Sequence, residues 1–121
     1  MSNKDLLTDI LHPDRLTAVV DIGASPVDGK PPYHTMLQSG LCNVVGFEPQ
    51  VEALAELKKA ATVNETYLPL VIGNGKRGVL HLCNSPGMTS LLEPDPDQLA
   101  LFNLFPDFGK VLDTINVDTV R

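Results

Sequence analysis

The chain has 121 residues, of which 43% are hydrophobic and 20% are charged, and this composition allows a single soluble domain with its own core. Its net charge of −6 and scattered basic residues argue against a nucleic-acid partner. No apolar run is long enough to cross a bilayer, and the first residues lack the pattern of a signal peptide. With only two cysteines, both expected to be reduced, the chain is expected to be cytoplasmic.

Residues 1–15 are expected to contain a short helix, because leucine and isoleucine recur there at helical spacing before Pro13. Residues 16–22 follow as the first strand, and their continuous apolar character favours a central parallel strand. Prolines and a glycine in residues 26–32 predict an irregular loop. A short helix is predicted over residues 33–39.

The second strand is predicted over residues 43–47, and the next helix begins at Pro49 and ends near Ala61. A third strand is predicted over residues 67–72. Strands that alternate with helices in this way predict a parallel sheet with right-handed crossovers. Residues 16–73 are therefore interpreted as a ligand-binding βαβαβ part.

Residues 74–121 are expected to form a hairpin and an extension. A turn cluster leads to a strand over residues 79–83, and the short spacing predicts an antiparallel hairpin with the strand before it. One or two helical turns are predicted over residues 97–104, and a loop over residues 106–109. The alternating polar and β-branched residues 111–120 predict a half-exposed strand.

Candidate site residues follow the first two strands. The first strand runs into Gly23, Ala24 and Ser25, and the second strand is followed directly by Glu48. Ligands of parallel α/β sheets bind at the carboxyl ends of the strands, where a glycine lets the backbone approach and a carboxylate accepts from ribose hydroxyls. The dinucleotide fingerprint is absent, because Ser25 occupies the place of its second glycine. A ligand without a pyrophosphate fits better, and S-adenosylmethionine is the common one.

Each of three polar candidates allows two interpretations. Glu48 either accepts from a ribose or is an acid favoured by the N-terminus of the following helix. Asp21 either orders the glycine turn by accepting its N–H groups or reaches the amino group of the cofactor. Asn74, after the third strand, either contacts the adenine or is a turn residue. No metal-ligand spacing is present.

The chain resembles the FkbM-type methyltransferases in several segments, which are VVDIGAS, VVGFEP, LPLVIGNGKRGVLHL, GMTSLLEP and a polar strand ending in DTVR. The resemblance covers about residues 16–121. It implies a Rossmann-like class I fold and S-adenosylmethionine-dependent methylation of a hydroxyl on a sugar or other small molecule. It also implies that Asp21 and Gly23 hold the amino-acid end of the cofactor and that Glu48 holds its ribose.

Members of that family continue beyond the polar strand into further strands and helices. Residues 1–121 therefore correspond to a single partial methyltransferase domain, the cofactor-binding half, which is expected to be inactive alone and to self-associate through its open sheet edge. No residue is nominated as the general base. The alternative is a non-catalytic, truncated or degenerate module. A nicotinamide-dependent oxidoreductase is disfavoured by the missing Gly-x-Gly-x-x-Gly motif.

Overall fold

The computed structural model describes residues 6, 9–10, 14–26 and 29–121. The chain divides into two compact units, Met1–Leu70 and Val71–Arg121. The sequence placed the internal boundary between residues 73 and 74, three positions later. The helix predicted within residues 1–15 falls mainly outside the described residues.

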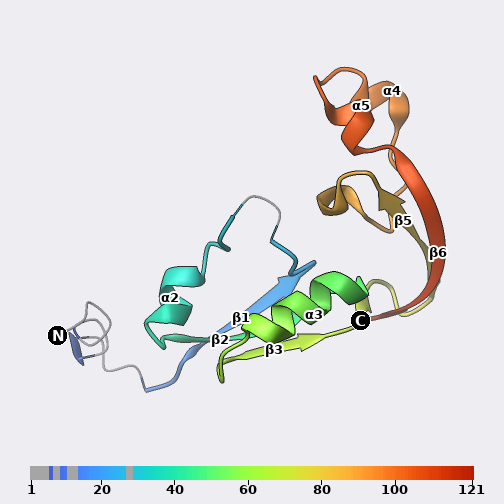
Figure 1. Cartoon of the computed structure of the whole chain (residues 1–121). Helices are drawn as coiled ribbons and strands as arrows, with labels where there is room; N and C mark the ends of the chain where they lie inside the picture. The colour runs from blue at the N-terminus through green and yellow to red at the C-terminus, as the bar shows by residue number, and fades with distance from the viewer. Residues whose placement is uncertain (1–5, 7–8, 11–13, 27–28) are drawn as a thin grey trace. The chain divides into compact units, whose positions relative to one another are not determined.

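The first unit contains a parallel sheet of three strands in the order β1-β2-β3 (Figure 1). Its elements in chain order are β1 (Thr17–Ile22), α2 (His34–Gln38), β2 (Cys42–Phe47), α3 (Val51–Ala60) and β3 (Glu65–Leu68). Each pair of neighbouring strands is joined by a connection that contains a helix, as parallel pairing requires. The unit is therefore mixed α/β, as predicted.

One face of this sheet is covered and the other is exposed. Cys42, Val44 and Tyr67 are buried on the covered face, where Leu54 of α3 packs against Tyr67 and Ala24. On the opposite face the aligned strand residues include Val20 and Ile22, whose side chains are 65% and 64% exposed, and Val45 at 36%. This alternation follows from the two-residue period of a strand.

The prediction that β1 is a central strand is wrong for the described residues, because β2 is central and β1 forms an edge. The apolar side chains of β1 point to both faces of the sheet, one covered and one exposed. Val19 and Asp21 lie on the covered side of the sheet, whereas Val20 and Ile22 face outward. A continuous apolar pattern therefore did not distinguish a strand buried on both faces from an edge strand with one uncovered face.

The second unit contains β4 (Val71–Ile72), β5 (Arg77–Cys83) and β6 (Val111–Val120), in the order β4-β6-β5. β4 is parallel to β6, and β5 is antiparallel to β6. Between β5 and β6 the chain forms a 3₁₀ turn, η1 (Pro86–Met88), and two short helices, α4 (Pro96–Leu99) and α5 (Phe105–Phe108) (Figure 1). The strand predicted over residues 111–120 is confirmed.

Three local predictions for this region are wrong. The strand predicted over residues 67–72 is interrupted at Pro69, which lacks an N–H for a ladder, so β3 and β4 belong to different sheets. The predicted hairpin is absent, because β5 pairs with β6 and not with β4. The loop predicted over residues 106–109 contains most of α5, whose first turn accommodates Pro106.

Candidate functional site

The turn after β1 is held by the end of β2. The N–H groups of Gly23 and Ala24 both donate to the carbonyl oxygen of Phe47, at 2.9 and 3.0 Å. Gly23 has φ +74°, a conformation that other residues rarely adopt, and a Cβ there would meet nothing within 4 Å. The glycine is therefore required by the backbone, and the space beside it is open.

Glu48 is buried beneath this turn, with only 2% of the residue exposed. Its Oε2 accepts from the N–H of Ser25 at 3.1 Å, and its Oε1 accepts from the N–H of Gln50 at 2.8 Å. Gln50 is the N-cap residue of α3, so the carboxylate joins the β1 turn to the start of that helix. A buried carboxylate needs such donors, and the helix N-terminus also favours its negative charge.

Asp21 receives a hydrogen bond from outside the glycine turn. The hydroxyl of Tyr33 donates to its Oδ2 at 2.5 Å. Tyr33 is the N-cap residue of α2, so Asp21 fixes the end of the proline-rich connection between β1 and α2. Burial and this hydrogen bond to Asp21 raise the pKa of the Tyr33 hydroxyl well above its usual value. Sequence reasoning missed Tyr33, although a tyrosine directly after Pro31-Pro32 was the available signal.

A second polar pair lies on the same face of the sheet. The hydroxyl of Tyr67 donates to Oε1 of Glu65 at 2.9 Å, and burial and that hydrogen bond raise the pKa of Tyr67 to about 12. Gly46 lies between Asp21 and Tyr67 in the strand register, and a Cβ at Gly46 would lie 2.5 Å from the Tyr67 ring. The missing side chain thus lets the tyrosine ring pack across the centre of the sheet.

A histidine adjoins this cluster. His34 is the first residue of α2, and its Nε2 is buried with no hydrogen-bond partner among the described residues. Burial raises the pKa of Glu65, but hydrogen bonds from Thr62 and Tyr67, and a smaller electrostatic interaction with His34, lower it below its ordinary value. The sequence offered no sign of this proximity, because His34 and Glu65 are far apart in the chain.

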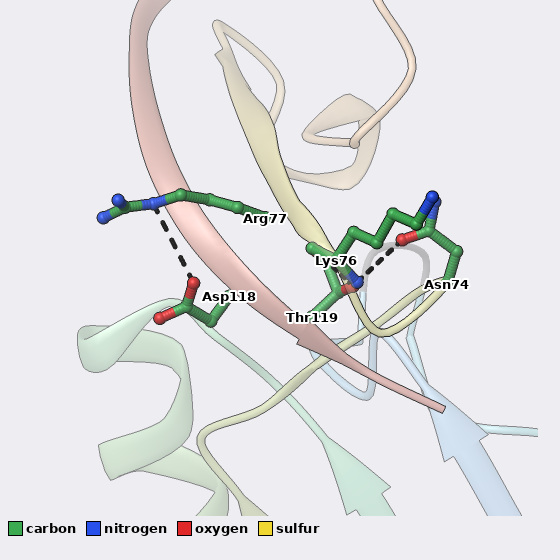
Figure 2. Close-up of polar contacts among 5 residues, drawn as sticks. All are labelled: Asn74, Lys76, Arg77, Asp118 and Thr119. Carbon is green, nitrogen blue, oxygen red and sulfur yellow. Dashed lines mark hydrogen bonds and ion pairs between the residues drawn. The ribbon is translucent and has the colours of Figure 1, made fainter.

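Asn74 belongs to the second unit and organises a turn. Its Oδ1 accepts from the N–H of Lys76 at 2.9 Å (Figure 2), and its carbonyl oxygen accepts from Nε of Arg121 at 2.8 Å. The buried Thr119 hydroxyl closes the same turn by donating to the Lys76 carbonyl at 2.7 Å and accepting from the Gly75 N–H at 3.0 Å. These contacts match the interpretation of Asn74 as a turn residue.

One basic residue that follows this turn forms an ion pair across the sheet. Arg77 extends toward Asp118 on the neighbouring strand, with Nε and Oδ1 3.8 Å apart and both side chains largely exposed (Figure 2). The turn N–H groups of Gly75 and Lys76 already donate within the protein. Of the residues predicted for one site, Asp21, Gly23, Ala24, Ser25 and Glu48 thus lie in the first unit and Asn74 in the second.

Cys42 and Cys83 are buried free thiols, and burial raises the pKa of each, which keeps them protonated. Within the described part of the chain, no group of histidine, cysteine, aspartate or glutamate side chains could hold a metal ion. None of the helices among the described residues has the length and apolar content needed to cross a membrane.

Comparison of the chain with protein-family models, with curated proteins and with solved structures finds no match.

Proposed function

We propose that the carboxyl edge of β1 and β2 binds S-adenosylmethionine, and that the chain is the cofactor-binding part of an O-methyltransferase with a Rossmann-like fold. The observation that carries this proposal is the glycine turn after β1. It has φ +74° and open space beside it, and it lies at the carboxyl end of a parallel pair whose second strand is followed by an acid. That is the edge at which parallel α/β sheets bind their ligands.

Two carboxylates flank the turn and have distinct roles in the proposal. Asp21 attracts the positively charged amino group of the cofactor while it accepts from Tyr33, because a carboxylate has several acceptor positions. Glu48 is 2% exposed and holds the turn through the Ser25 and Gln50 N–H groups, so its proposed contact with the ribose hydroxyls requires the carboxylate to become accessible when the ligand binds. Methyl transfer from a sulfonium is a direct displacement, for which the chain supplies mainly positioning. The acceptor is the hydroxyl of a small molecule.

Calorimetric titration of the chain with S-adenosylhomocysteine tests this proposal. Asp21→Asn keeps an oxygen that accepts from Tyr33 but loses the charge, so we expect affinity to fall at least about tenfold. Glu56→Gln, an exposed change on α3, is the matched control and should leave the affinity unchanged. Absence of binding to the unaltered chain, or equal affinities for the two variants, would refute the assignment. A change in NADH fluorescence on mixing would instead favour a nicotinamide cofactor.

A second candidate function, a self-associating module, is favoured by the exposed face of the first sheet. Val20 and Ile22 are mostly exposed on β1, which pairs with a neighbour on only one side among the described residues. Unpaired edges with apolar faces promote association between chains. Light scattering should give a mass that rises with concentration, and Ile22→Lys should abolish the rise. Val63→Lys, at a site that is 98% exposed, is the control. A constant monomeric mass would rule out this candidate.

A further inference from the structure

The connection between β5 and β6 and the first residue of β6 line a partly open cavity of about 340 Å³. The lining residues come from two stretches, one on each side of the α4–α5 corner. Leu99, Val111 and three prolines provide apolar walls, while Glu93 and Lys110 bring opposite charges to the lining. A cavity of this volume and character accommodates one or two large apolar side chains or a small ligand.

The same connection exposes several large apolar side chains. Leu101 is 73% exposed, and Phe102 and Leu104 are each 60% exposed. The ring of Phe105 contacts those of Phe102 and Phe108, with centroids 5.7 and 6.2 Å apart. Exposed apolar clusters of this kind are typical of protein interaction sites, in which aromatic residues are enriched. The exposed apolar side chains of this connection are therefore not confined to the lining of the cavity.

The charge around this surface is strongly biased. Within residues 91–110 the acidic residues are Glu93, Asp95, Asp97 and Asp107, and the single basic residue is Lys110. Asp95 also caps α4 by accepting from the N–H groups of Asp97 and Gln98, at 3.0 and 3.2 Å, and it is exposed at the surface. These four exposed acids, here called the acidic rim, repel anionic lipid headgroups and attract partners that carry lysine or arginine.

Leu104 adds a backbone feature to this picture. It lies between α4 and α5 with φ +68°, which is rare for a residue that is not glycine. It is followed directly by Phe105, which packs between the two other phenyl rings. The corner thus turns at an apolar residue that remains exposed, in a backbone conformation that costs stability.

We propose that the cavity and the exposed apolar side chains of residues 93–110, here called the α4–α5 surface, bind a basic amphipathic segment of a partner protein. An apolar side chain of the segment enters the cavity between the prolines and Leu99. The phenyl rings cover its apolar face, and the acidic rim pairs with its lysine or arginine residues. This interaction is independent of the proposed cofactor site, because every residue that forms the surface belongs to the second unit.

The test uses two fluorescent synthetic helices of about 15 residues, each with one leucine face. One carries lysine on its polar face and the other carries glutamate. Fluorescence anisotropy should show that the full chain binds the lysine helix at least about tenfold more tightly than the glutamate helix. Added salt should reduce this difference, because the charges are exposed. Equal affinities for the two helices would overturn the proposal.

Paired variants separate the two parts of the surface. Phe102→Ser should weaken binding of the lysine helix about tenfold, whereas Val63→Ser, at an exposed apolar site in the first unit, should not. Glu93→Lys should also weaken binding of the lysine helix, whereas Glu56→Lys on α3, the charge control, should not. Similar losses for variant and control would overturn the proposal. If the chain bound only small apolar probes, the surface would be assigned to a small ligand. If the chain formed dimers that Phe102→Ser dissociates, the surface would be assigned to a second copy of the chain.

Discussion

Replacement of Glu48 by glutamine should destabilise the first unit more than the same replacement of Glu52 or Glu56, the acids of α3. The residue is 2% exposed, and each carboxylate oxygen accepts from one backbone N–H, from Ser25 and from Gln50. Glutamine has one oxygen, so one of the two N–H groups would face an amide NH₂. A hydrogen bond to a charged group contributes about 1.5–3 kcal/mol, and a buried donor without a partner costs about 1–3 kcal/mol. We expect Glu48→Gln to lower the free energy of unfolding by about 2–3 kcal/mol.

Tyrosine fluorescence during urea unfolding measures this effect in the correct unit. The chain has two tyrosines and no tryptophan, and both tyrosines, Tyr33 and Tyr67, lie in the first unit. The midpoint should fall by roughly 1–2 M urea, given the usual dependence of unfolding free energy on urea for small domains. Glu56→Gln, exposed on the same helix, should shift it little. Equal midpoints for Glu48→Gln and Glu56→Gln would show that the carboxylate does not hold the turn.

Three further predictions concern pH and the second unit. Burial raises the pKa of Glu65, but hydrogen bonds from Thr62 and Tyr67 lower it below its ordinary 4.5. Stability should therefore be lost as the pH falls through that lowered pKa, and Glu65→Gln should weaken this loss in urea titrations. The pKa of Tyr67 is raised to about 12, so absorbance should show this tyrosine ionising above pH 10.0. Stability should be lost between pH 10.0 and about 12. Ionisation of Tyr67 at pH 10.0 would contradict the buried hydrogen bond between Tyr67 and Glu65. Thr119→Val removes a hydroxyl with two backbone partners and should speed hydrogen exchange along β5 and β6, whereas Thr119→Ser should not.

The elements that the sequence predicted well are those set by local patterns. The helix after Pro49 was recognisable because its apolar residues repeat at helical spacing, but it begins at Val51, so Pro49 precedes the N-cap Gln50 and is not in the first turn as predicted. The strand over residues 111–120 was recognisable because its side chains alternate. The glycine after Ile22 was recognised from its place between an apolar strand and a turn, and its φ of +74° agrees with that role.

What the sequence did not predict depends on contacts between distant segments. The pairing of β5 with β6 joins residues on either side of two helices, and no local pattern specifies such a partner. The same holds for Tyr33, whose hydroxyl reaches Asp21 from the start of another element. Nor could the pattern of β1 reveal that Val20 and Ile22 would be exposed, because burial depends on which elements cover the sheet.

The two carboxylates of the candidate site can be separated by comparing stability with ligand affinity. If Glu48 both holds the turn and accepts from the ribose, Glu48→Gln should lower the unfolding free energy and the affinity for S-adenosylhomocysteine together. Asp21→Asn should lower the affinity with a smaller effect on stability, because the amide oxygen still accepts from Tyr33. A Glu48→Gln chain that is destabilised but binds the ligand normally would assign Glu48 to the support of the turn alone. The ribose would then need a different acceptor, while Asp21 and the glycine turn would keep their proposed roles.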